Sequence, residues 1–235
     1  MPAKKLPDTD EERIKALQLI IEQEELNRME NPILSPDKIH EYRTFLLSFE
    51  NARFCLRQAQ DDAAKADKSY TDFFKSAQLY ISHFIQVLNL AIIRNEVKAE
   101  NLMYYGIEDG TEFHVPDLST EDAILEWGRR LTKGEMERTS RGGVPIYNPA
   151  ISKVIVHYDL FKDAIQSLTV YQKNILRAQE KLDEMREKID RMIWDTWTKV
   201  EFKYWELPVA DRKEKFREYG IQFHHPVAEQ LDVFS

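Results

Sequence analysis

Residues 151–207 read ISKVIVHYDLFKDAIQSLTVYQKNILRAQEKLDEMREKIDRMIWDTWTKVEFKYWEL, and this stretch contains neither glycine nor proline. Apolar side chains recur along it every three or four residues, which places them on one face of an α-helix. Asn148-Pro149, just before it, supplies a capping residue followed by proline. The pattern predicts one helix over residues 149–206, about 75 Å long at 1.5 Å per residue. Val154–Val156 and Val200–Tyr204 also have the β-branched or alternating pattern of strands, so the continuity of this helix is left open.

A second stretch without glycine or proline covers residues 37–105. Ser35-Pro36 predicts the start of a helix there, which we expect to end softly near Lys65–Lys68. A third, strongly apolar helix is expected to begin at Ser69 or Thr71. Upstream, Thr9-x-x-Glu12 matches a capping box and predicts a first helix that ends at Asn31-Pro32.

Shorter elements follow from the remaining turn signals. Ser119–Asp122 predicts a short helix through about Leu131, and residues 209–219 predict another that Gly220 closes. Residues 97–118 and 134–148 are expected to be loops, and residues 1–8 and 226–235 flexible ends. Long helices with apolar faces must bury them against one another. We therefore predict an all-α fold, an antiparallel bundle of three to four long helices plus short ones, with at most a minor strand element, in a single domain over residues 1–235.

The composition narrows the classes of function. A net charge of −8 argues against a dedicated nucleic-acid binder, which usually carries a basic surface. Seven glycines are few for a nucleotide-binding α/β fold, since average usage of about 7% would give roughly 16. One cysteine excludes a disulfide framework and a cysteine-based zinc site. The start of the chain has no apolar signal region, and no apolar run is long enough to span a bilayer. We expect a cytoplasmic protein with no membrane span.

No cofactor, metal site or catalytic residue is predicted. The sequence has no Glu-x-x-His pair, which a di-iron bundle needs on two helices. His83 and His157 are interpreted as core or boundary residues, Cys55 as a small buried one, and His224-His225 as a solvated pair.

One basic segment is a candidate anion-binding site, because arginines, lysine and glycine amides can hold a phosphate or carboxylate. The alternative is a solvated loop, since Glu135 and Glu137 dilute its charge. The candidate residues are Arg129, Arg130, Lys133, Arg138, Arg141, Gly142 and Gly143.

The far end of the long helix is a candidate interface. If shorter neighbours end before it, its apolar stripe is left bare, which a monomer rarely tolerates. A two-fold dimer would cover the stripe with a second copy. Alternatively, residues 209–235 fold back over it. The stripe consists of Leu182, Met185, Ile189, Ile193 and Trp197.

These patterns favour a non-enzymatic helical interaction or scaffold protein that self-associates. Its expected partner is another protein or a second copy, with a dimer favoured, and not nucleic acid. The alternative is a module that binds an anionic small molecule or nucleic acid through residues 129–143. An enzyme is the third hypothesis, since catalytic groups can assemble in space without a legible spacing.

Overall fold

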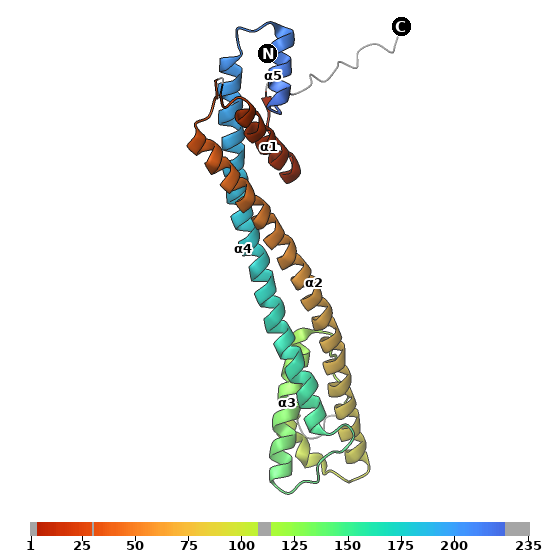
Figure 1. Ribbon diagram of the computed structural model, residues 1–235. Helices are drawn as coiled ribbons and strands as arrows, with labels where there is room; N and C mark the ends of the chain where they lie inside the picture. Colours follow the sequence, from red (N-terminus) through yellow and green to blue (C-terminus); the bar gives the residue numbers. More distant parts are fainter. Residues whose placement is uncertain (1–3, 30, 108–113, 224–235) are drawn as a thin grey trace, which may run out of the picture. The chain divides into compact units, whose positions relative to one another are not determined.

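The computed structural model describes residues 4–29, 31–107 and 114–223 (Figure 1). The fold is all-α: 77% of the chain is helical, and the long helices α2 (Pro36–Ile93) and α4 (Ile151–Lys203) pack together. This confirms the predicted fold class. The chain forms two compact units, Met1–Gln58 with Leu176–Ser235 (the first unit) and Ala59–Ile175 (the second unit). That the two units act as a single domain stays a prediction.

In the first unit, α1 (Asp10–Leu26) covers parts of α2 and α4. Its start has the predicted capping box, because Thr9 accepts from the Glu12 amide while the Glu12 carboxylate accepts from the Thr9 amide. Two charged contacts fix α1 on α4: Arg13 Nε donates to Asp190 over 2.8 Å, and Arg186 Nη2 donates to Asp10 over 2.6 Å. Side chains on one face of α1 are buried, including Leu17, Ile20 and Ile21.

The end of the first unit is closed by α5 (Val209–Glu218), the helix predicted before Gly220. Gly220 has a φ of +70°, the left-handed conformation that favours glycine after a helix. The chain then forms β2 (Gln222–Phe223), which pairs antiparallel with β1 (Lys4–Lys5). This two-residue pair is the minor strand element. It includes residues 4 and 5, which belong to the segment 1–8 that the sequence analysis expects to be a flexible end.

The second unit has an apolar core of its own. η1 (Ala99–Tyr105) and α3 (Glu121–Ser140) pack beside the second half of α2 and the first half of α4. The core cluster is drawn from all four elements, and includes Ile81, Phe84, Leu88, Leu102, Ile124, Leu131, Val154 and Phe161. On the α-helices these side chains recur three, four or seven residues apart, so the sequence pattern that predicts the helices also identifies their buried faces.

The predicted break at Lys65–Lys68 is wrong, because α2 is one helix of 58 residues. Ser69 and Thr71 do not cap a new helix. Their hydroxyls donate to Lys65 O and Asp67 O of the preceding turn, over 3.1 Å each. This back-bonding leaves the helix intact. Ala59, Ala63 and Ala66 also favour helix strongly there.

The helix α3 runs through Ser140, so the loop predicted at residues 134–148 begins only after that position. The long helix α4 is continuous over 53 residues, and Val154–Val156 lies inside it. Residues 200–203 are also helical, and Tyr204 lies in the following turn. Neither segment that resembled a strand is one.

One finding bears on membranes. A window of 18 residues within α2 has a mean hydropathy of 1.3, enough by length and composition to cross a bilayer, and 33% of the window is buried in the structure. The core helix of a globular protein meets the same criterion, so this is weak evidence. The absence of a membrane span stays a prediction.

Candidate functional site

The cationic side chains and glycine amides of the basic segment, residues 129–143, do not gather around a single site. Arg138 is buried and is held by the fully buried Glu135, to which its Nε and Nη2 donate over 2.9 and 2.8 Å. Arg138 also donates to Val144 O over 2.8 Å. A charge this completely paired is not available to a ligand, and its role in the structure is to attach the chain after α3 to α3 itself.

Tyr105 completes this buried cluster. Its hydroxyl donates to Glu135, and Arg138 Nε donates to the same hydroxyl over 3.0 Å. Burial, together with the bond to Glu135, raises the pKa of Tyr105 well above its ordinary value of 10.0. The Ile146 amide also donates to Glu135, over 3.0 Å. Glu135 therefore accepts from η1, α3 and the α3–α4 loop together.

The two glycines of the segment serve the end of α3. The amide of Gly142 donates to Thr139 O over 3.0 Å, and that of Gly143 donates to Arg138 O over 3.1 Å. Both amides are therefore used within the turn that ends the helix, and they do not point at a common ligand.

The remaining cations lie at the surface. Arg129, Arg130 and Lys133 line an open hollow of about 460 Å³ between η1 and α3, together with Glu126 and Glu137. Arg129 donates to Glu126 over 2.7 Å. Arg130 donates to the carbonyl oxygens of Tyr105, the last residue of η1, and of Gly106, which follows it.

Arg141 stands outside this hollow and donates to Glu137 over 2.9 Å. The carboxylates in and around the hollow offset its positive charge. Anion binding by this segment stays a prediction.

The predicted interface stripe lies inside the first unit. Leu182, Ile189, Ile193 and Trp197 are buried, and Met185 is half-buried. The expectation that this stripe is bare is wrong. The physical reason is that other elements of the first unit cover this part of α4. The chain after α4 folds back over it, as the alternative prediction has it, and Trp197 Nε1 donates to Tyr219 O, just beyond α5, over 2.9 Å.

The histidines and the cysteine take varied positions. His83 is exposed, and Cys55 is exposed rather than buried as expected. The ring of His157 stacks on Tyr80, with 3.9 Å between ring centroids. His224-His225 lies outside the described residues. In the described ranges, no three His, Cys, Asp or Glu side chains group as a metal site would require.

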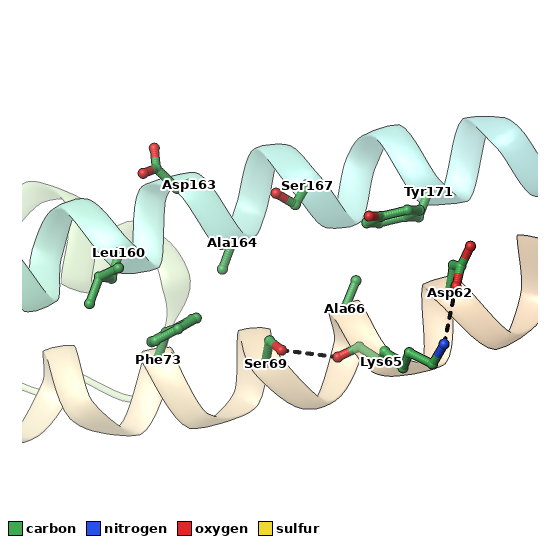
Figure 2. Close-up of a pocket in the computed structure, with 10 residues that line it drawn as sticks. All are labelled: Asp62, Lys65, Ala66, Ser69, Phe73, Leu160, Asp163, Ala164, Ser167 and Tyr171. Carbon is green, nitrogen blue, oxygen red and sulfur yellow. Dashed lines mark hydrogen bonds and ion pairs between the residues drawn. The ribbon is translucent and has the colours of Figure 1, made fainter.

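A groove that the sequence analysis missed lies between α2 and α4 in the second unit (Figure 2). It has a volume of about 330 Å³. Small side chains line its middle, while Phe73 and Leu160 lie at one end and Asp62 and Tyr171 at the other. The small residues are Ala66, Ser69, Ala164 and Ser167. Neither α3 nor η1 contributes a lining residue, so among the described residues of the unit only α2 and α4 line this groove.

The signal for the groove was present in the sequence. On both helices an alanine is followed three residues later by a serine, at 66 and 69 and at 164 and 167. They indicate close approach or a hollow only once the two segments are known to face each other, and sequence alone does not supply that pairing.

Comparisons with known proteins assign no family. No family model matches the chain, no curated protein matches it, and no solved structure matches it. Proposals about its function therefore depend on its own surfaces and contacts.

Proposed function

We propose that this protein is a non-enzymatic helical interaction protein that also self-associates. The observation that carries the proposal is a cluster of uncovered apolar side chains where α4 passes into α5, here called the aromatic turn. Its residues are Phe202, Trp205, Leu207 and Val209. Phe202 is 89% exposed and Trp205 58% exposed. Exposed apolar clusters of this kind commonly mark interaction surfaces.

The turn is held in place although its apolar side chains are uncovered. Arg212 donates to Trp205 O over 3.2 Å, and its guanidinium lies 5.3 Å from the centre of the Trp205 ring. Lys203 Nζ donates to Asn31 O, which attaches the turn to the loop between α1 and α2. A surface ordered before binding loses less entropy when a partner arrives.

The residue types also favour protein binding. Tryptophan and arginine are enriched among the side chains that dominate binding energy at protein interfaces. In the aromatic turn both are present and in contact, as Trp205 and Arg212. Acidic residues Glu206 and Asp211 lie beside them in the sequence, which favours a protein partner over an anionic surface. The absence of catalysis and the cytoplasmic location stay predictions.

The aromatic turn can be tested by partner capture. The full chain serves as bait in an extract of its own host, next to the double variant Phe202→Ser/Trp205→Ser. We expect bound proteins to fall at least about tenfold in the variant, since removing hot-spot side chains costs about 2 kcal/mol or more each. Leu79→Ser is the matched control, because Leu79 is 62% exposed and belongs to the second unit. Equal capture by all three proteins would contradict the role of the turn.

A further inference from the structure

We propose that α4 opens locally over residues 165–175, here called the opening segment, while the core of the second unit stays folded. In such an opening the backbone hydrogen bonds of a segment break and re-form in the otherwise native protein. The opening segment lies across the groove from residues 59–69 of α2, here called the facing segment (Figure 2). This opening is a conformational property of the fold, and it is independent of the proposed interactions.

The two segments bury almost none of their side chains. The structure describes every residue of both, and the single buried side chain among them is Ala63, at 9% exposed. Farther along α2 in the same unit, Ile81, Phe84 and Leu88 are 0% exposed. Most of the stability of a helix in a protein comes from packing of its apolar face. The two segments are therefore held less firmly than the core beside them.

The position of α3 accounts for this difference in burial. Glu121, the first residue of α3, accepts a hydrogen bond from the Tyr70 hydroxyl over 2.9 Å, so α3 begins level with the end of the facing segment. At the same level the ring of Phe161 lies 5.5 Å from the rings of Tyr70 and Phe74, which joins α4 to α2. Two helices alone bury only a narrow seam, whereas a third helix encloses a core.

The seam between the two segments is also incompletely filled. Ala66 and Ser167 line the groove of about 330 Å³, and their short side chains leave it open (Figure 2). A hollow of this kind replaces contacts between apolar atoms, so little packing is lost when the segments separate. Because most residues of the opening segment are exposed or half-buried, water can satisfy the backbone groups that opening frees.

The residue types indicate that α4 opens rather than α2. The facing segment contains four alanines, and alanine is the strongest helix former. The opening segment contains no alanine, and seven of its residues are of types that favour helix less. These seven are Ile165, Ser167, Thr169, Val170, Tyr171, Asn174 and Ile175. A helical segment with few buried contacts and weak propensity opens before its neighbours.

Amide hydrogen exchange of the full chain, read segment by segment, tests the opening. After correction for intrinsic rates, the amides of residues 166–175 should exchange at least about tenfold faster than those of residues 81–88, in the core of the same unit. They should also exchange at least about threefold faster than those of residues 60–69. Exchange as slow as that of residues 81–88 would overturn the proposal. Equal exchange in the two segments would overturn the assignment of the opening to α4.

Two valines of α4 provide a matched pair of variants. Val170 lies in the opening segment and Val156 lies beside the core, and they are 54% and 55% exposed. Val170→Gly should speed exchange of residues 166–175 at least about threefold, since glycine makes the native helix there less stable than its open form. Val156→Gly should leave that exchange unchanged, because residue 156 stays folded when the segment opens.

Circular dichroism should show that both glycine variants remain helical. Equal acceleration of residues 166–175 by the two variants would mean that these amides exchange only when the whole unit unfolds. That result would overturn the proposal.

Discussion

At the scale of single residues, two buried glutamates tie the ends of the helices together. In the first unit, Glu24 is fully buried and accepts from the amides of Ile33 and Leu34, over 2.8 and 2.7 Å, and from the Tyr219 hydroxyl over 2.7 Å. In the second unit, Glu135 accepts from Tyr105, Arg138 and the Ile146 amide. Each carboxylate thus connects a helix to a loop and to a tyrosine far away in the sequence.

The cluster around Glu135 gives a prediction about stability. Glu135→Leu removes the acceptor and leaves the Arg138 charge buried without its partner, so the free energy of unfolding should fall by about 3–5 kcal/mol. Urea denaturation measures the change. Glu126→Ala is the control, because the exposed Glu126–Arg129 pair should contribute about 1 kcal/mol or less. A loss below about 1 kcal/mol in Glu135→Leu would show that the cluster does not hold the loop.

Residues such as these are where sequence reasoning is weakest. Arg138 reads as one cation among several in a basic segment, and nothing in the spacing shows that Glu135, three residues earlier, is buried against it. Likewise, Trp197 belongs to an apolar stripe that the sequence predicts to be bare. It is buried because α5 and the residues after it fold back over this part of α4. Both outcomes depend on contacts between residues far apart in the sequence, which local periodicity does not encode.

At the scale of elements, local signals predict most of the structure. The capping box at Thr9, the Ser35-Pro36 start and the Gly220 end all correspond to observed helix boundaries. The boundaries that are predicted wrongly rest on weak local signals. Serine and threonine near residue 70 can cap a helix or bond back to it, and sequence does not distinguish the two.

The sequence predicts that a loop begins at Gly134, but this residue lies inside α3. The position gives a prediction about stability. Glycine is needed at this position because η1 packs closely against it: a Cβ there would be 2.5 Å from Tyr105 Cδ1 and 2.7 Å from Tyr104 O. Gly134→Ala should therefore lower the free energy of unfolding by about 1–3 kcal/mol through overpacking. At an uncrowded helical position the same change would gain about 1 kcal/mol.

Urea denaturation checks this, with Lys133→Ala as the control. Lys133 is the exposed neighbour on α3, and its replacement should change stability by no more than about 0.5 kcal/mol. A more stable Gly134→Ala protein would mean that η1 does not pack against α3 as closely as the structure has it.

At the scale of the whole molecule, each unit leaves a different surface uncovered. The first unit presents the aromatic turn, and the second unit presents the groove between α2 and α4. The sequence favours an interaction protein on the strength of an apolar stripe on the long helix. The structure buries that stripe and leaves other apolar side chains exposed, so the surface proposed here differs from the one expected.

The central claim is that the chain self-associates, and its mass in solution tests that most directly. Light scattering coupled to gel filtration, over a range of concentrations, should give twice the chain mass of 27.8 kDa at high concentration, falling toward a single chain on dilution. A mass of one chain at every concentration would contradict the account.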